Sequence, residues 1–346
     1  MGTAPWSTQS PSSRPPDVRA LITGASGFAG TWLVRACAQA GDEVIALSRR
    51  PAVPTAHEAD GAVTSISVDL RDAEAVRATI AQADPDVVYH LAALSSVGRS
   101  WESPAQTLSE NTATAINLLE ALRLEARSAR VVWVSTCEVY GVPDALPLTE
   151  SAPLQPANPY AVSKASAEML AAVYARAHGL DIIRARPFSH SGPGQRPIFL
   201  LASLTRQAAE GRRAGVSELT IVTGNPDTRR DFTDVRDVVR AYRLLAERAP
   251  AGVYNVSTGA SVSAAEQVAL LGEVVAPIVI SHEVDPSRVR ASEVMDLRGD
   301  HAALTATTGW KPEIPLRQTM TEAVAWWEQT LAADAGAAAP PISGGR

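Results

Sequence analysis

The sequence predicts an α/β protein with a Rossmann-type, doubly wound parallel sheet and a smaller, discontinuous C-terminal substrate lobe. Three observations lead to this fold class. Short apolar runs alternate with amphipathic stretches through the first half of the chain. A glycine-rich turn joins the first apolar run to the first helical stretch. The alternation loosens after Pro187, where glycine and proline crowd into a loop. Apolar runs of this kind are typical of parallel strands covered by helices on both faces.

The elements follow one another as βαβ units require. We expect the first strand at Val18–Thr23, a helix over Gly30–Ala40 and a second strand at Glu43–Ser48. Further strands are predicted at 66–69, 87–91, 131–135 and 180–186. Helices between them are predicted at 73–83, 109–127 and 160–178, and later helices at 235–248 and 263–273. Strands that alternate with helices run parallel, because each helix carries the chain back across the sheet.

The chain divides into two lobes and two tails. Residues 18–188, with about 233–257, are predicted to form the Rossmann domain, and residues 189–232 and 258–330 the smaller lobe. Residues 1–17 are rich in proline and serine and lack the apolar segment of a signal peptide. Residues 331–346 are mostly alanine, glycine and proline without periodicity. Both ends are predicted to be disordered tails.

Composition excludes several classes of function. The 346 residues are 46% hydrophobic, which is enough for a large core, and the net charge of −6 offers no basic face for nucleic acid. No apolar run is long enough to span a membrane. The two cysteines, Cys37 and Cys137, have no metal-ligand spacing and indicate reduced thiols. We therefore expect a cytoplasmic protein without a metal site, a membrane segment or a nucleic-acid partner.

A glycine-rich turn at Thr23–Gly30 follows the first predicted strand and opens the first helix. Glycines at this spacing allow a tight turn and let a pyrophosphate approach the backbone at the positive end of the helix. A plain strand-to-helix turn is the alternative, but the strand-turn-helix context favours a dinucleotide. The residues predicted to contact it are Gly24, Ser26, Gly27, Phe28 and Ala29.

The second predicted strand ends in Ser48, Arg49 and Arg50. Enzymes that prefer NAD usually place an acidic residue here, where it binds the ribose 2′-hydroxyl. Two guanidinium groups instead suit a 2′-phosphate, although a solvated arginine pair is the alternative. The predicted cofactor is NADP(H), with NAD(H) as the second choice, and Arg49 is predicted to bind it.

Asn158 and Pro159 begin a predicted helix that carries Tyr160 and Lys164. Because these two residues are four apart, their side chains share one helical face. An ammonium beside a phenol stabilises the phenolate and should lower the pKa of the tyrosine, which suits acid–base catalysis.

Polar residues follow the predicted strand that ends at Val134, at the carboxyl edge of the sheet, where such folds bind ligands. For Ser135 we expect a local backbone hydrogen bond, and for Cys137 core packing. Thr136 and Glu138 are candidate catalytic residues. The Glu138 carboxylate could remove a C–H proton or hold a sugar hydroxyl, and the sequence leaves both roles open.

The GxxGxxG turn together with Tyr160-xxx-Lys164 resembles the extended short-chain dehydrogenase/reductases that act on nucleotide sugars, over about residues 18 to 328. The resemblance implies that Thr136 hydrogen-bonds the substrate oxygen and that Lys164 also bonds the nicotinamide ribose. It further implies a homodimer that packs through the helices at 109–127 and 160–178. The additional cofactor contacts that it implies are Asp69, Leu70, Leu91, Ala92, Ala93 and Pro187.

The later motifs bear on the substrate. Residues 186–195 resemble a loop typical of GDP-4-keto-6-deoxymannose reductases, although Ser189 stands where asparagine is usual. Residues 229–238 match another segment of the superfamily, in which we expect structural roles for the aspartates and a diphosphate contact for the second arginine. The predicted substrate contacts are Ser96, Glu138, Ser189, Arg230, Arg290 and Glu293. For His190 we expect a structural role.

The activity that this resemblance implies is reduction of a GDP-4-keto-6-deoxyhexose at C4 by NAD(P)H, giving GDP-D-rhamnose. The alternatives are a nucleotide-sugar 4,6-dehydratase of the GDP-mannose type and a 4-epimerase, both of which recycle their cofactor. A non-catalytic nucleotide sensor is a third class. Sensors on this fold commonly lose the tyrosine or the lysine, whereas this chain keeps Thr136, Tyr160 and Lys164.

Overall fold

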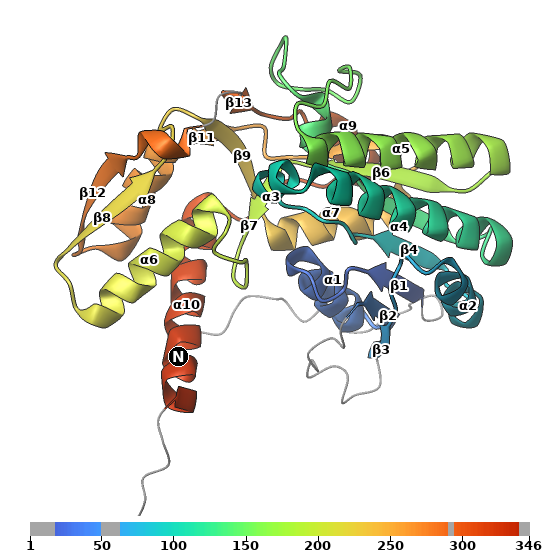
Figure 1. Ribbon diagram of the computed structural model, residues 1–346, viewed down its shortest axis with the longest axis horizontal. Helices are drawn as coiled ribbons and strands as arrows, with labels where there is room; N and C mark the ends of the chain where they lie inside the picture. Colours follow the sequence, from blue (N-terminus) through green and yellow to red (C-terminus); the bar gives the residue numbers. More distant parts are fainter. Residues whose placement is uncertain (1–17, 50–62, 290–293, 339–346) are drawn as a thin grey trace, which may run out of the picture.

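A computed structural model describes residues 18–49, 63–289 and 294–338 (Figure 1). Its first lobe is built on a seven-stranded sheet of order β10-β6-β5-β4-β1-β2-β3 in which every pairing is parallel. The predicted doubly wound sheet is therefore confirmed. The strands are β1 (Arg19–Thr23), β2 (Glu43–Ser48), β3 (Val63–Ser67), β4 (Val87–His90), β5 (Arg130–Val134), β6 (Ile182–Pro187) and β10 (Val253–Val256).

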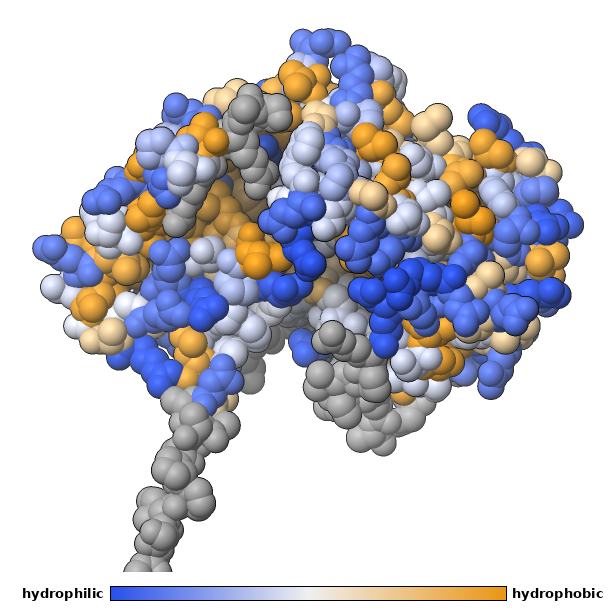
Figure 2. All heavy atoms as spheres, viewed as in Figure 1, coloured by the Kyte–Doolittle hydropathy of each residue, from blue (hydrophilic) through white to orange (hydrophobic). Residues whose placement is uncertain are grey.

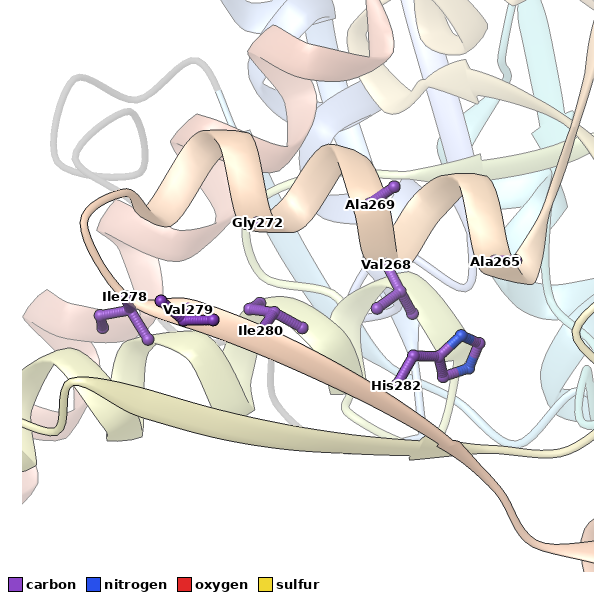
Figure 3. Close-up of a pocket in the computed structure, with 8 residues that line it drawn as sticks. All are labelled: Ala265, Val268, Ala269, Gly272, Ile278, Val279, Ile280 and His282. Carbon is purple, nitrogen blue, oxygen red and sulfur yellow. The ribbon is translucent and has the colours of Figure 1, made fainter.

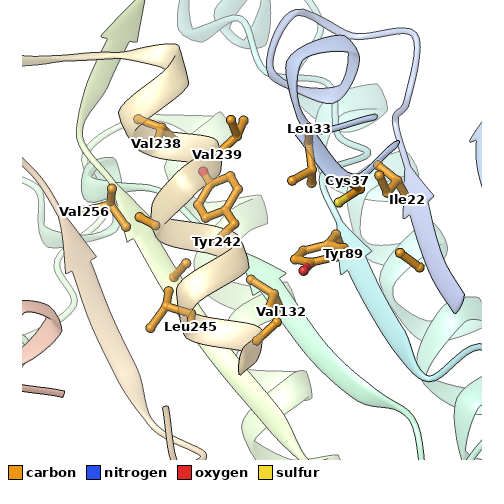
Figure 4. Packing of buried hydrophobic residues seen from close by; sticks show 14 of the residues in the cluster. Ile22, Leu33, Cys37, Tyr89, Val132, Val238, Val239, Tyr242, Leu245 and Val256 are labelled. Atoms are coloured by element: carbon orange, nitrogen blue, oxygen red, sulfur yellow. The ribbon is translucent and has the colours of Figure 1, made fainter. Parts of the chain in front are cut away.

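Helices cover both faces of this sheet. One face packs on α1 (Phe28–Gln39) and α7 (Val235–Arg248), and Figure 4 shows Leu33, Tyr89 and Tyr242 meeting in that core. The opposite core packs under three helices, α2 (Ala73–Ala83), α4 (Pro104–Glu125) and α5 (Pro159–His178). Strands buried on both sides explain why their sequences read as continuous apolar runs.

The second lobe lies beside the carboxyl edge of the main sheet (Figure 1). In it β9 (Arg229–Asp234) pairs with β7 (Ser189–Ser191), β11 (Ser261–Ser263) and β13 (Asp296–Leu297), and β8 (Glu218–Thr223) pairs with β12 (Val279–Val284). A separate core packs these strands against α6 (Leu200–Ala214), α8 (Ala264–Val275) and α10 (Leu316–Ala338). Apolar side chains gather on the face of this lobe shown at the left of Figure 2.

In two segments the structure departs from the boundaries predicted for the second lobe and for the C-terminal tail. Leu304 and Trp310, in the range predicted for the substrate lobe, are buried in the first core, where α9 (Ala302–Thr308) packs on α7. The Trp310 indole also donates to the Asp237 carbonyl oxygen at 2.9 Å. At the end of the chain, α10 continues to Ala338, past the predicted start of a tail at residue 331, because alanine favours helix and Leu331 packs on the second core.

No helix among the described residues is long and apolar enough to cross a membrane.

Candidate active site

The glycine turn between β1 and α1 is shaped by close backbone contacts. Gly24 has φ +71°, and a Cβ there would lie 2.9 Å from the Ala92 nitrogen; a Cβ on Gly30 would lie 2.1 Å from the Gly24 carbonyl oxygen. Only glycine fits these two positions, because any side chain would push the turn away from β4 or from itself. The loop after β4 is thus held directly against the turn.

The first turn of α1 is free to receive an anion. Gly27 is its N-cap and supplies no side-chain hydrogen bond, and no acidic residue lies in the first turn. Ser26 and Gly27 are exposed. Unpaired N–H groups and the positive end of the helix fit the pyrophosphate of a dinucleotide. The Phe28 ring is already stacked on His190 of the second lobe, with ring centroids 6.0 Å apart.

Charged side chains gather where β2 and β3 end. Arg49 and Arg71 both approach Glu110 of α4, with N···O distances of 3.6 and 3.4 Å. Arg71 also pairs with Asp69, and their hydrogen bonds lower the pKa of Asp69 to about 2. The two guanidinium groups suit a 2′-phosphate. Sequence analysis missed Arg71, although it stands two residues after the predicted contact Asp69; Arg50 lies outside the described residues.

The loop after β4 is fixed by two side chains that sequence analysis did not single out. The Thr23 hydroxyl accepts the Ala92 N–H at 3.2 Å and contacts His90 Nδ1 at 2.8 Å. Asn111 of α4 accepts the Leu94 N–H at 2.7 Å and donates to the Leu94 carbonyl oxygen at 3.2 Å. The half-buried backbone of residues 91–93 is thereby held beside the glycine turn.

Tyr160 and Thr136 meet at the carboxyl edge of β5. Both are buried, and the Thr136 side chain lies near enough to the Tyr160 hydroxyl to act on its pKa. Burial raises the pKa of Tyr160 well above its ordinary value, and the nearby Thr136 side chain opposes this only in part. We expected the neighbouring lysine to lower that pKa. Instead, Lys164 donates to the Val134 carbonyl oxygen at 2.5 Å, so burial dominates.

Lys164 is itself perturbed by burial. Its side chain is only 4% exposed, and desolvation lowers its pKa to about 8, although Glu168 acts in the opposite direction. A buried lysine with such a pKa can lose its charge near the pH at which the protein works. The lysine lies one turn after Tyr160 on α5, as the spacing predicts.

Glu138 is held by Asn158. The carboxylate oxygen Oε2 accepts a hydrogen bond from Asn158 Nδ2 at 2.9 Å, and Glu138 lies in the short 3₁₀ helix η1 (Cys137–Tyr140), which Thr136 caps. Ser96 lies farther along the same edge as the N-cap of α3 (Val97–Glu102). The structure thus places Thr136, Glu138, Tyr160 and Lys164 at one end of β5 and α5.

A buried polar network, missed by sequence analysis, lies behind these residues. Ser135 donates to Glu168 at 2.6 Å rather than to the local backbone, as we had expected. Glu168 pairs in turn with Arg186, whose closest N···O distance is 2.6 Å, and Arg186 donates to the Tyr140 hydroxyl at 2.9 Å. The pair joins α5 to β6 beneath the catalytic segment. No periodic pattern marks contacts between residues this far apart in sequence.

The predicted substrate residues have structural contacts. Ser189 pairs with Phe232 in the β7–β9 ladder, and His190 Nδ1 contacts the Phe188 carbonyl oxygen at 3.1 Å, while burial lowers the pKa of His190. Arg230 donates to the Arg229 and Val294 carbonyl oxygens at 2.7 and 2.8 Å. Arg290 and Glu293 lie outside the described residues.

Aspartates of the same segment have the structural roles that we expected. Asp231 accepts from the N–H groups of Thr258 and Gly259, and Asp234 caps α7. Asp237 accepts from the Glu313 and Ile314 N–H groups, both within 3.0 Å.

An apolar groove on the second lobe is not part of this site. It lies between α8 and β12 and is lined by residues that include Val268, Ile280 and His282 (Figure 3). None of the predicted site residues lines it. His282 is occupied by a 2.7 Å contact between its Nε2 and the Thr223 hydroxyl.

Comparison with known proteins identifies the family. Residues 21–323 match the family described as GDP-mannose 4,6 dehydratase. The chain belongs to this family. Among curated relatives, GDP-6-deoxy-D-mannose reductase of Pseudomonas aeruginosa is 39% identical over 250 residues, which cover 71% of this chain and 82% of the relative. GDP-mannose 4,6-dehydratase of Vibrio cholerae is 28% identical, and the match covers 88% of this chain and 92% of the relative.

Solved structures of similar proteins share the fold. RMD from Pseudomonas aeruginosa, solved in complex with NADPH, is similar with a TM-score of 0.75 and 33% identity. The match covers 90% of this chain and 99% of that one. The Rossmann-type assignment and the extended short-chain dehydrogenase/reductase resemblance are both confirmed.

Proposed function

We propose that this chain reduces the 4-keto group of a GDP-4-keto-6-deoxyhexose with NADPH, giving GDP-D-rhamnose. The observation that carries the proposal is the buried pair Thr136–Tyr160 at the carboxyl edge of β5, one helical turn before Lys164. The phenol keeps its proton at neutral pH, which suits an acid that protonates a newly formed alkoxide. The 39% identity to a GDP-6-deoxy-D-mannose reductase supports the same reaction.

The cofactor residues fit a phosphorylated dinucleotide. The open N-terminus of α1 would hold the pyrophosphate, and Arg49 with Arg71 would hold the 2′-phosphate. The backbone of residues 91–93 and Pro187 would border the rest of the cofactor. When bound, NADPH supplies the hydride that reduces C4.

Residues of this chain supply the proton that the sugar O4 receives during reduction. Tyr160 donates its hydroxyl proton to the sugar O4, and Thr136 hydrogen-bonds the same oxygen as negative charge develops there. Lys164, when protonated, stabilises the phenolate that the donation leaves behind. Glu138 holds a sugar hydroxyl, and Ser96, Ser189 and Arg230 border the substrate from the loop before α3 and from the second lobe.

A 4,6-dehydratase is the second candidate, because Glu138 lies beside the catalytic pair and dehydratases are among the relatives. Such an enzyme begins by removing a proton from the C4 hydroxyl, which requires the tyrosine in its deprotonated form. Burial of Tyr160 opposes that form, whereas a reductase uses the protonated one.

Two parallel assays test the proposal. Purified protein is incubated with GDP-4-keto-6-deoxymannose plus NADPH, and separately with GDP-mannose. The proposal expects NADPH consumption in the first assay and no conversion in the second. Conversion of GDP-mannose to its 4-keto-6-deoxy product without net NADPH consumption would establish the dehydratase instead.

We also propose a homodimer. Large apolar side chains stay exposed along α4 and α5, which lie side by side (Figure 1). Exposed apolar side chains on two neighbouring helices are typical of an interface with a second copy, and a twofold arrangement would cover them with the same helices. The exposed residues are Leu108, Ile116, Leu124, Val162, Met169 and Val173.

A further inference from the structure

Asn158 connects two parts of the site with a single amide group. Its Oδ1 accepts the Ala161 N–H at 2.8 Å and so caps α5, the helix that carries Tyr160 and Lys164. Its Nδ2 donates to Glu138 Oε2 at 2.9 Å. The cap and the carboxylate contact therefore belong to one half-buried side chain.

The chemistry of both partners fixes the orientation of this amide. A backbone N–H needs an acceptor, which only the amide oxygen of Asn158 supplies. The Glu138 carboxylate needs a donor, which only the amide nitrogen supplies. A flipped amide would face an N–H with NH₂ and a carboxylate with a carbonyl oxygen, so both contacts would be repulsive.

We propose that Asn158 is a positioning residue, which fixes the Glu138 carboxylate relative to Tyr160. By engaging Oε2, it sets the direction in which the other carboxylate oxygen points. Because the same residue starts α5, a displacement of the helix would carry Glu138 with it. The inference deepens the proposed function and rests on it for the identity of the sugar that Glu138 holds.

If Asn158 only capped the helix, other capping residues at position 158 would serve equally well. Aspartate caps helices as well as asparagine does, and it has nearly the same shape. Asn158→Asp therefore keeps the cap but replaces the donor with a second carboxylate that repels Glu138. Asn158→Ser also keeps a capping oxygen, but its side chain is too short to span the distance to Glu138.

The experiment is a double-mutant cycle of Asn158→Asp and Glu138→Gln. Each single variant should keep the melting temperature of the full chain but lose roughly 10- to 150-fold in kcat/KM, the effect of one hydrogen bond to a charged group. In Glu138→Gln the amide oxygen still accepts from Asn158, so the NH₂ group faces the sugar in place of a carboxylate oxygen. In the double variant that NH₂ group donates to the new aspartate, and the amide oxygen faces the sugar again. Its loss should be at least tenfold smaller than the product of the two single losses.

Ser263→Ala is the matched control, because Ser263 caps α8 of the second lobe by accepting the Glu266 N–H at 3.0 Å. It should lower the melting temperature and leave kcat/KM unchanged. Wild-type kinetics in Asn158→Asp, or single losses that simply multiply in the double variant, would overturn the inference.

The two assays described above keep this inference separate from the proposed function. Which substrate the wild type converts tests the function, and the ratio of variant to wild type in the active assay tests Asn158. If the wild type converts neither substrate, the proposed function fails by itself. The same cycle is then measured on GDP-mannose binding by calorimetry, where additive losses overturn the role of Asn158.

Discussion

At the scale of single residues, burial sets the protonation states of the site. It raises the pKa of Tyr160, lowers that of Lys164 to about 8, and lowers that of His90 to about 3. Each direction follows from the cost of holding charge away from water. The site thus combines a protonated phenol with a lysine that titrates near neutral pH, a combination that the spacing of the two residues alone could not predict.

The pH dependence of reduction follows from Lys164. The lysine is charged below about pH 8 and neutral above it, so kcat should fall as the pH rises through about 8, where the phenolate loses its stabilising charge. Lys164→Arg keeps its charge at every working pH and should remove this falling limb, whatever its overall rate. A wild-type kcat that stays level until the tyrosine itself titrates would contradict this role.

At the scale of elements, apolar periodicity predicted α2 and α7 with the observed bounds, because each buries one regular stripe. It misplaced β3, predicted at 66–69 and found at Val63–Ser67. This strand lies at the edge of the sheet, and its polar residues Thr64 and Ser65 are exposed, so no apolar run marks its start. The buried Glu168–Arg186 pair was missed because a charged residue predicts an exposed position unless its partner is also known.

The glycine turn should tolerate no side chain at Gly30. Gly30→Ala places a methyl group 2.1 Å from the Gly24 carbonyl oxygen, so overpacking should cost about 1–3 kcal/mol of unfolding free energy and weaken NADPH binding. Gly272→Ala, in the middle of α8 with only ordinary contact to Ile280, should instead stabilise by about 0.5–1 kcal/mol. Thermal unfolding and NADPH titration of both variants check the contrast; equal effects would refute it.

The arginines at the ends of β2 and β3 should select the 2′-phosphate. Arg49→Ala combined with Arg71→Ala removes both guanidinium groups near Glu110, so binding of 2′,5′-ADP should weaken by 10-fold or more, roughly one charge-assisted hydrogen bond. Binding of 5′-AMP, which lacks the 2′-phosphate, should change little. Calorimetry with the two nucleotides measures the difference, and parallel losses for both would contradict selection.

At the scale of the whole molecule, the site depends on segments far apart in the chain. β10 returns residues 253–256 to the main sheet, as the sequence predicted, whereas α9 and Trp310 join the first core from a range assigned to the second lobe. The Phe28–His190 stack and the 3.1 Å hydrogen bond from Trp32 Nε1 to the Pro193 carbonyl oxygen connect the two lobes. The sequence patterns predict the helices and strands well, but they do not predict which lobe's hydrophobic core each one packs in.

We predict that the exposed apolar residues of α4 and α5 form the interface of a homodimer. Met169→Glu places a charge in the proposed interface, where Met169 is 60% exposed, and should convert the dimer to a monomer in light scattering at micromolar concentration. Val279→Glu, at a site 63% exposed on the second lobe, is the matched control and should leave the dimer intact. A wild-type monomer, or a dimer that resists Met169→Glu, would place the interface elsewhere.

The fate of the hydride tests the central claim most directly. GDP-4-keto-6-deoxymannose is incubated with NADPH carrying deuterium at both nicotinamide C4 positions, and the product is analysed by NMR. A reductase with Tyr160 as its acid predicts one deuterium at sugar C4, one NADPH consumed per product, and loss of the reaction in Tyr160→Phe by about 10²–10⁴-fold. Product formed from GDP-mannose with hydrogen moved from C4 to C6, solvent deuterium at C5 in D₂O and no NADPH consumed would contradict the account.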